Sequence, residues 1–317
     1  MRRFIVAAFA LGTLSTGANA QTACTSGSAL AADACAVGAD LFAYLAPQLG
    51  TSLTGASHTL GVGTTLGGFP HFAIALRGNA VMGDLPDISD VSAGPAQQRT
   101  INTSEQILGL PTVDFALGLY KGFNLGVTRV GGIDLIGGVT YVPEIAEGDI
   151  TIMPQDGSIA VGLGARVGLL EQSALIPGIA FSYMKRDLPT VDFGASSGSG
   201  DTFAINDFSV KTSSWRLSAQ KNFLIFQLGA GYGSDTYDFS TSASVSVDNG
   251  AQTATFDAAQ SMTRSTMYGS LGINLFLFKL VGEVGQVSGG EAPTFNDFTQ
   301  PADKARTYGS LGIRISF

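Results

Sequence analysis

The last ten residues of the chain constrain its fold more than any other stretch. Residues 308–317 read YGSLGIRISF, and every second residue counted back from Phe317 is apolar or glycine. A period of two predicts a β-strand with one apolar face and one polar or small face. A soluble protein would rarely leave such an apolar strand uncovered at the end of its chain. The strand therefore requires apolar surroundings outside the fold.

The start of the chain has the pattern of an export signal. Arg2 and Arg3 precede an apolar run from Phe4 to Leu14, and an A-x-A cleavage pattern ends at Ala20. This order of features predicts a secretory signal peptide over residues 1–20. The apolar run is shorter than the roughly 20 residues that a membrane-spanning helix needs.

The composition also points to apolar surroundings. Charged residues make up 13% of the chain, 42 residues are glycine and the net charge is −8. Soluble domains are nearer a quarter charged. Since no later apolar run is long enough for a spanning helix, a closed β-barrel is the other way to satisfy every backbone group in lipid. An acidic chain without clustered Lys and Arg also excludes nucleic acid as a partner.

Two cysteines, Cys24 and Cys35, follow the predicted cleavage site. In an oxidising compartment they predict a disulfide that closes a small loop. Their spacing matches neither a redox CxxC motif nor a zinc site, and the only histidines are His58 and His71. We therefore expect no metal and no cofactor.

One segment has a helical rather than an alternating pattern. Apolar residues between Ala36 and Leu53 recur at a spacing near 3.6, which predicts an amphipathic helix that starts near Asp40 and is kinked or interrupted at Pro47. Two positions are open to it: it plugs or lines the lumen of a barrel, or it lies in the periplasm beneath one. The pattern slightly favours the plug.

Alternating segments fill the rest of the chain. Their second face carries Gly, Ala, Ser and single charged residues, which suit a crowded or wet lumen better than the surface of a soluble sheet. About ten segments share this pattern: Phe72–Leu76, Val113–Leu119, Ile133–Tyr141, Ile159–Leu169, Ile179–Tyr183, Trp215–Ala219, Leu224–Tyr232, Leu271–Leu275, Leu280–Val284 and the terminal strand.

The connections between these segments alternate in length when the terminal strand is taken to run towards the periplasm. The short ones are 276–278, 221–223, 170–175 and 121–132, and the long ones are 288–306, 237–262, 187–208, 143–157 and 81–110. Short periplasmic turns and long outer loops are typical of outer-membrane barrels. Within 237–262, the Asn249-Gly250 pair predicts a hairpin that extends above the membrane.

The strand number is less constrained. Residues 59–66 also alternate and would make an eleventh strand. Bacterial single-chain barrels have an even number of strands, so either this segment lies in the lumen or periplasm, or a partner strand has been missed. We expect 10–14 strands, with 12 preferred.

Candidate chemistry is sparse. A hydrolase needs an activated nucleophile, usually with a His base, and the chain offers His58 and His71 but no G-x-S-x-G motif. We therefore predict that the protein is not an enzyme; an outer-membrane lipid hydrolase is the weak alternative.

Single charged residues on the inward parity form a candidate lumen-lining set, because a Lys or Arg facing lipid near the midplane costs about 2–4 kcal/mol. Two interpretations stay open: the set lines a polar pore, or it forms ion pairs that brace a closed lumen. Its members are Arg77, Asp114, Asp134, Arg166, Arg216, Glu283 and Arg314.

Taken together, the strand that ends on Phe317, the alternating segments and the loop lengths resemble a bacterial outer-membrane β-barrel of an uncharacterised family. More loosely, residues 36–66 before the first strand resemble the hatch of the long-chain fatty-acid outer-membrane transporters, which pass hydrophobic substrates through 14-stranded barrels. This chain is shorter and lacks a hallmark substrate-site motif, so transport is an analogy.

The resemblance implies an organisation and a location. We expect a signal peptide at 1–20, an N-terminal segment at 21–66 with the disulfide loop and the helix, and an antiparallel up-and-down transmembrane barrel at 67–317 in the bacterial outer membrane. The expected partners are membrane lipid and lipopolysaccharide, and the barrel assembly machinery, which would recognise the strand ending at Phe317. The oligomeric state stays open.

Two functions fit this organisation. The first is a porin-like passive channel or transporter for small or hydrophobic molecules. The second is a non-transporting structural or adhesive surface protein with long outer loops.

Overall fold

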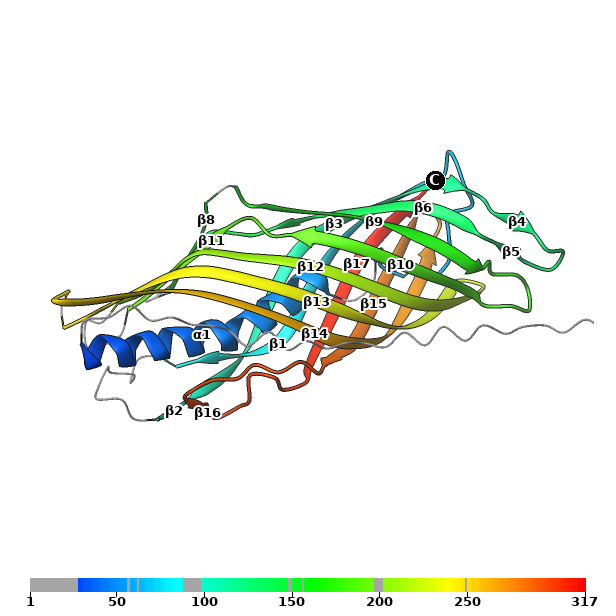
Figure 1. Cartoon of the computed structure of the whole chain (residues 1–317). Coiled ribbons are helices and arrows are strands. Elements are labelled where there is room, and N and C mark those ends of the chain that lie inside the picture. The colour runs from blue at the N-terminus through cyan, green and yellow to red at the C-terminus, as the bar shows by residue number, and fades with distance from the viewer. Residues whose placement is uncertain are drawn as a thin grey trace, which may run out of the picture.

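A closed antiparallel sheet surrounds a helix in the computed structural model (Figure 1). The structure describes residues 28–55, 58–61, 63–87, 98–147, 150–155, 157–196, 202–248 and 250–317. The predicted signal peptide and Cys24 lie outside these residues. The disulfide between Cys24 and Cys35 therefore stays a prediction, and Cys35 itself is buried in the helix.

Consecutive long strands pair as neighbours around a ring, and β10 pairs with β12 to complete it. The ring has ten strands: β1 (Phe72–Pro86), β3 (Thr103–Tyr120), β6 (Gly132–Tyr141), β9 (Ile159–Leu170), β10 (Gly178–Asp187), β12 (Thr202–Phe223), β13 (Phe226–Val247), β14 (Gln252–Leu275), β15 (Phe278–Ser288) and β17 (Arg306–Ser316). The predicted all-β, antiparallel, up-and-down fold with a short N-terminal helix is confirmed.

The ring closes with ten strands, which lies within the expected range of 10–14 but below the preferred number of 12. The alternating segment 59–66 caused the difference. Its described residues take turn and bend conformations and lie inside the barrel. Alternation alone does not distinguish a strand from a segment that is in contact with the lumen wall on all sides.

Short accessory strands extend the two ends of the barrel. At one end β4 (Phe123–Asn124) and β5 (Arg129–Val130) form a small hairpin. At the other end β11 (Val191–Ser196), β8 (Ile150–Pro154) and β7 (Ile145–Glu147) widen the sheet beside β12, and β2 (Thr100–Ile101) pairs with β16 (Asp297–Phe298). The described parts of the long connections lie at this second end, opposite the C-terminus (Figure 1).

The terminal strand seals the barrel as its pattern predicts. β17 lies between β1 and β15. The backbone N–H of Phe317 donates to the carbonyl of Phe72 and that of Phe72 donates to the carbonyl of Phe317, each at 2.9 Å. The two rings stack with centroids 5.0 Å apart. The last residue thus completes the closure rather than hanging free.

The strands β13 and β14 reverse their polarity along their length. Near the turn that joins β12 to β13, Phe226, Leu228 and Tyr232 are exposed on the outer surface. Further along, outward positions become hydroxylic, as at Ser240, while inward positions become apolar, as at Phe239. The first pattern suits lipid outside and a polar lumen inside, and the second suits water outside and an apolar interior.

Outward aromatic residues mark the two edges of the lipid-facing band. One group, near the short turns, includes Phe72, Phe226, Phe278 and Phe317. The other includes Tyr141, Tyr183, Trp215 and Tyr232, with the rings of Trp215 and Tyr232 5.9 Å apart. Two such girdles around an apolar band define a transmembrane β-barrel. The protein is therefore a barrel of the bacterial outer membrane.

We call the barrel between the girdles the spanning level and the part beyond Tyr232 the outer level. By the loop-length rule, the end with the short turns and Phe317 faces the periplasm. The outer level faces the cell exterior.

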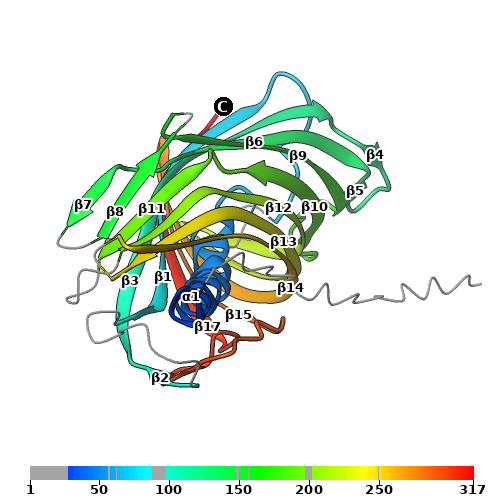
Figure 2. The same ribbon diagram turned by 60° about the vertical axis from the view of Figure 1, so that its left-hand side comes forward.

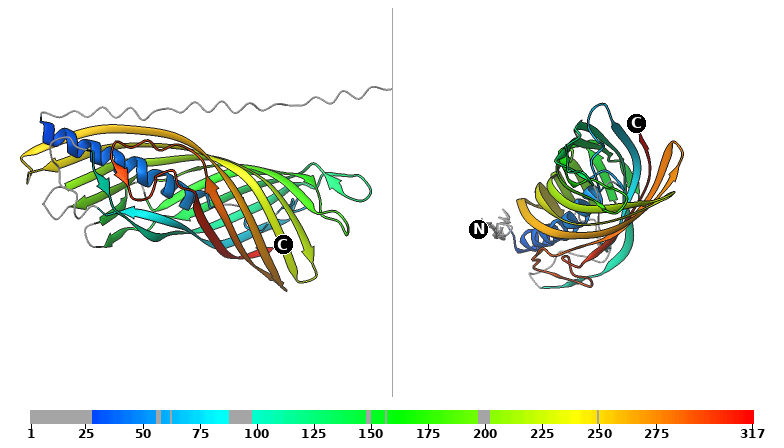
Figure 3. Two further views of the ribbon diagram at one scale, coloured as in Figure 1. Left: turned by 90° about the horizontal axis from the view of Figure 1, so that it is seen from below. Right: turned by 90° about the vertical axis from the view of Figure 1, so that its right-hand side faces the viewer.

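The helix α1 (Ala29–Thr54) lies within the ring of strands (Figures 2 and 3). It begins earlier than the predicted start near Asp40, because the alanine-rich residues before Cys35 favour helix and Ser28 caps them by accepting a hydrogen bond from Ala31 N. It continues through Pro47. By length and composition α1 could cross a membrane, yet most of it is buried inside the barrel.

Candidate functional site: the occupied lumen

The described residues between Ser28 and Leu66, which we call the plug, lie along the lumen. Their contacts with β13 show how deep each part of the plug lies. Gly61 meets Gln227 of β13 at the periplasmic end, since Gln227 Nε2 donates to its carbonyl. Thr54 meets Tyr237 at 3.0 Å between hydroxyls. Gly38 faces Val245 near the outer end. The helix and the residues after it therefore occupy both the outer and the spanning levels.

At the outer level the contact is apolar. Val37, Leu41 and Phe42 of α1 join a buried cluster with inward residues of β12 to β14, among them Phe208 and Phe256. These inward positions are apolar because this part of the barrel packs against a helix instead of enclosing water. Burial of apolar surface stabilises the contact by roughly 25 cal/mol for each Å² removed from water.

One carboxylate of α1 attaches an outer loop to this cluster. Asp40 is buried and accepts hydrogen bonds of 2.7 Å from Phe295 N, Asn296 N and Asn296 Nδ2. Burial raises the pKa of Asp40 above its ordinary value of 3.8, and the hydrogen bonds from Asn296 and Phe295 offset this only in part. The loop between β15 and β17 is thereby tied to the helix.

Deeper in the barrel, the wall supplies the cations that the end of α1 lacks. The last turn of α1 has no basic residue. Arg186 Nη1 donates to Thr54 O and Arg77 Nη1 donates to Gly55 O, each at 3.0 Å. Cations near a helix C-terminus are stabilising because they oppose the partial negative charge of its free carbonyls. The wall therefore holds the helix end electrostatically.

A single carboxylate connects these two arginines. Asp114 accepts from Arg77 Nε at 2.6 Å and lies 3.7 Å from Arg186 Nη2. All three side chains are 5% exposed or less. Asn79 adds a third bond to the plug, because its Nδ2 donates to Ser52 O at 2.7 Å. We call Arg77, Asn79, Asp114 and Arg186 the upper clamp.

A second set holds the residues that follow the helix. Asp134 accepts from Leu66 N at 3.1 Å and forms a 2.6 Å ion pair with Arg166 Nη2. Arg166 Nη1 in turn donates to Thr59 Oγ1 at 2.6 Å. We call Asp134 and Arg166 the lower clamp. Arg314 Nη1 donates to Gly61 O at 3.3 Å, so the chain after the helix is bonded to the wall at several points.

His58 lies between two serines of the wall. Its Nδ1 is 2.8 Å from Ser182 Oγ and its Nε2 is 2.7 Å from Ser214 Oγ. A Ser–His contact of this length is the geometry of an activated nucleophile, but in a triad the second ring nitrogen faces a carboxylate. Here it faces another serine, and all three side chains are buried. The bonds of His58 thus serve to anchor the plug.

His71 lies at the periplasmic end, away from His58, with its Nδ1 2.8 Å from Gly68 O. Among the described residues, no group of His, Cys, Asp and Glu is arranged to hold a metal ion.

The structure brings the sequence-predicted lumen set together inside the barrel. All seven residues are buried, from Asp134 at 0% exposed to Arg314 at 9%. Arg77 pairs with Asp114, Arg166 with Asp134, and Arg216 with an additional residue, Asp235, at 2.6 Å. Glu283 is buried on β15.

Sequence reasoning missed several further lumen residues. Asp84, Arg186, Asp235, Arg264 and Arg306 are all buried in the barrel wall. Four of them continue the inward parity of strands that were ended too early; Arg306, for example, lies two residues before Tyr308 on the face that carries Arg314. Extending each alternation past the predicted strand end would have found those four. Asp84 falls where two successive residues of β1 are buried, so alternation does not identify it.

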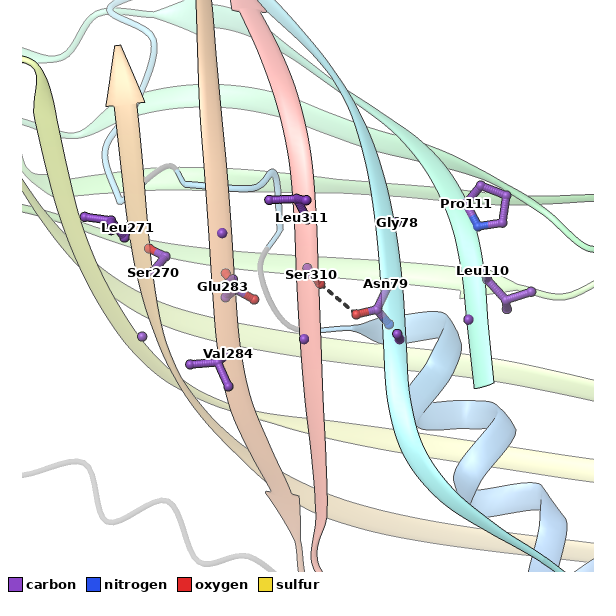
Figure 4. Close-up of a pocket in the computed structure, with 15 residues that line it drawn as sticks. Gly78, Asn79, Leu110, Pro111, Ser270, Leu271, Glu283, Val284, Ser310 and Leu311 are labelled. Atoms are coloured by element: carbon purple, nitrogen blue, oxygen red, sulfur yellow. Dashed lines mark hydrogen bonds between the residues drawn. The ribbon is translucent and has the colours of Figure 1, made fainter. Parts of the chain in front are cut away.

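A hollow of about 920 Å³ lies on the other side of the wall (Figure 4). Glycines on neighbouring strands, such as Gly78 and Gly282, leave open space where a side chain would stand. Leu271, Val284 and Leu311, which are exposed to lipid, frame it. Beneath it, Ser310 Oγ donates to Asn79 Oδ1 at 2.7 Å. The hollow faces away from the lumen and is not part of the candidate site.

Comparisons with known proteins give no family. No family model and no curated protein matches the chain. Among solved structures, the transport unit of the autotransporter AIDA-I from Escherichia coli aligns with 11% identity and a TM-score of 0.38, covering 88% of this chain and 99% of that one.

Two further solved structures are similar at a lower level. The outer membrane protease OmpT from Escherichia coli aligns with 9% identity and a TM-score of 0.35, over 78% of this chain and 96% of that one. A mutant of TodX, a monoaromatic hydrocarbon channel, aligns with 9% identity and a TM-score of 0.28, over 78% and 89%. At these TM-scores the likenesses carry no argument about what this chain does.

Proposed function

We propose that this protein is a closed, non-conducting outer-membrane barrel that acts at the cell surface as a structural or adhesive protein. The observation that carries the proposal is the occupied lumen. The upper and lower clamps bond the plug to the wall by buried side chains, several of them charged. Each hydrogen bond between a charged clamp side chain and the plug contributes about 1.5–3 kcal/mol, so several such bonds together oppose release of the plug.

Transport of hydrophobic molecules receives little support from the same geometry. The apolar inward surface of the outer level is already covered by α1. Beneath it, a hydrophobic molecule would meet the buried ion pairs Arg77–Asp114, Arg166–Asp134 and Arg216–Asp235. Desolvating these groups without replacing their partners is costly.

The outer level has the form of a display surface. β13 and β14 extend beyond the outer girdle as one long hairpin, joined by a turn at Asp248–Ala251 where Ala251 N donates to Asp248 O at 3.1 Å. Its outward face is hydroxylic and its inward face packs on α1. A surface protein needs outer strands of fixed shape, and the helix provides the core that fixes them.

Conductance in planar lipid bilayers tests the proposal. We expect the intact protein to show negligible current, and deletion of residues 28–66 to open steady conductance steps. A clamp variant, Arg77→Gln with Arg186→Gln, should open intermittently because the helix end loses both wall cations. Arg129→Gln is the matched control, since Arg129 is half exposed near the periplasmic end and pairs with Glu171 rather than with the plug.

Steady open steps from the intact protein would overturn the proposal and favour the channel. Folding of each variant is checked by its heat-dependent migration on a gel, which reports a closed barrel independently of current.

A further inference from the structure

The direction in which α1 runs has a topological consequence. The helix begins near the outer tip of the barrel and ends deeper inside it, where Thr54 meets Tyr237. Its capping residue Ser28 bonds through Oγ to Gln252 Oε1, at the tip of the β13–β14 hairpin. Figure 1 shows the start of α1 beside that tip, at the opposite end of the barrel from the chain terminus.

The described residues after the helix contact wall residues towards the periplasmic end. Gly55 contacts Arg77, Thr59 contacts Arg166, and Gly61 contacts Arg314. These wall residues lie progressively nearer the periplasmic end. At that end His71 O accepts from Gly118 N, and β1 then starts beside Phe317.

We infer that the barrel carries its own N-terminal segment to the cell exterior and displays there the chain that leads into Ser28. A chain exported by a signal peptide reaches the periplasm first. The observed path then requires the segment before α1 to cross the outer membrane inside the barrel, with residues 28–66 left in the lumen. The inference depends on the orientation of the barrel and not on whether the barrel conducts.

The contacts along the path fit a segment that is retained after crossing. The polar clamps bond to the end of α1 and the residues after it. The outer two-thirds of α1 packs on β12 to β14 through apolar contacts and is joined to outer loops through Asp33 and Asp40. Gly50 and Gly55 allow the backbone to lie against the wall, since a Cβ atom would stand 2.7 Å from Tyr237 Cδ1 and 1.9 Å from Asn79 Nδ2 respectively. The plug is therefore shaped to this wall.

Epitope accessibility on intact cells tests the inference. One variant carries a short epitope inserted directly before Ser28, and its matched control carries the same epitope between Leu224 and Ile225, in the turn between β12 and β13. We expect antibody to stain intact cells that carry the first variant. The second should stain only after the outer membrane is permeabilised.

Two other outcomes would each contradict the inference. If both epitopes are hidden until permeabilisation, the segment before α1 does not reach the exterior and the inference fails. If only the turn epitope stains intact cells, the assumed orientation is reversed and the inference fails with it. Neither result alters the bilayer currents, so failure here is distinguishable from failure of the proposed closed state.

A second pair of variants covers the case in which an insertion prevents folding. In a background that carries Cys24→Ser and Cys35→Ala, the variants Ala29→Cys and Leu224→Cys place single thiols at exposed positions at the two ends of the barrel. With a membrane-impermeant maleimide, Ala29→Cys should label at least tenfold faster than Leu224→Cys on intact cells, and equal rates should appear after permeabilisation. Slower labelling of Ala29→Cys on intact cells would overturn the inference.

Discussion

Gly50 lies where α1 comes nearest to the barrel wall. A Cβ atom at this position would stand 2.7 Å from Cδ1 and 2.9 Å from Cε1 of Tyr237, closer than carbon atoms pack. The Tyr237 ring is itself fixed by a hydroxyl contact with Thr54 and by stacking on Phe239 at 5.7 Å. The ring therefore has little freedom to move aside.

We predict that Gly50→Val destabilises the folded barrel by about 1–3 kcal/mol, the usual cost of overpacking a filled core. The measurement is the urea dependence of folding in lipid vesicles. Ala29→Val is the control, because Ala29 is exposed at the start of the same helix. Equal stability of the two variants would show that the helix does not pack against Tyr237.

Asp40 makes the stability of the folded protein depend on pH. Because burial raises its folded pKa above 3.8, the folded state holds the proton more tightly than the unfolded state. Its contribution is most favourable below the ordinary pKa and is lost as the pH rises through the folded pKa. Each unit of pKa shift corresponds to about 1.4 kcal/mol.

We predict that Asp40→Asn removes this dependence. The melting temperature of the native protein in detergent, relative to that of the variant, should fall as the pH rises from about 3.5 and should be constant near neutrality. Loss of the native hydrogen bonds to Phe295 and Asn296 changes the melting temperature of the variant equally at every pH. It therefore does not change how the difference in melting temperature varies with pH. A difference that grows towards neutral pH would contradict the assignment.

At the scale of elements, the polarity reversal along β13 assigns each outward position to lipid or to water. Ala230 lies between Leu228 and Tyr232 in the lipid-facing band, and Ser240 faces outward on the same strand beyond the girdle. We predict that Ala230→Lys destabilises folding into vesicles by about 2–4 kcal/mol. Ser240→Lys should change it by less than about 0.5 kcal/mol. Equal losses of folding free energy for the two variants would mean that both positions face lipid or both face water.

The sequence predicts this element scale well, and for a physical reason. A strand between lipid and lumen must alternate, so the ten strands and the inward parity of Arg166 and Arg216 follow from the pattern. The predicted strands ended too early at the level where the outer surface passes from lipid to water. There β13 continues past Tyr232, but its polar face is outside and its apolar face inside. Residues 59–66 were ambiguous because they alternate like a strand although their described residues form turns and bends inside the barrel.

At the scale of the whole molecule, the charged lining of the lumen suits a bound plug better than bulk water. Seven arginines and five carboxylates are buried on the described strands: Arg77, Arg166, Arg186, Arg216, Arg264, Arg306, Arg314, and Asp84, Asp114, Asp134, Asp235, Glu283. Part of the positive excess is used by backbone carbonyls of the plug, such as Thr54 O and Gly61 O. No alternation pattern in the sequence reveals this use, because the carbonyls belong to every residue type.

Removal of the plug should therefore expose a positively charged pore. We predict that the variant lacking residues 28–66 prefers chloride over potassium, seen as the sign of the reversal potential across a bilayer with unequal KCl on its two sides. Adding Arg166→Gln and Arg216→Gln leaves five buried arginines facing five buried carboxylates, so the reversal potential should move towards zero. The steep dependence of charge interactions on ionic strength predicts a weaker preference in concentrated salt. A cation preference in the plug-free barrel would mean that the arginines balance the wall itself and are not there to hold the plug.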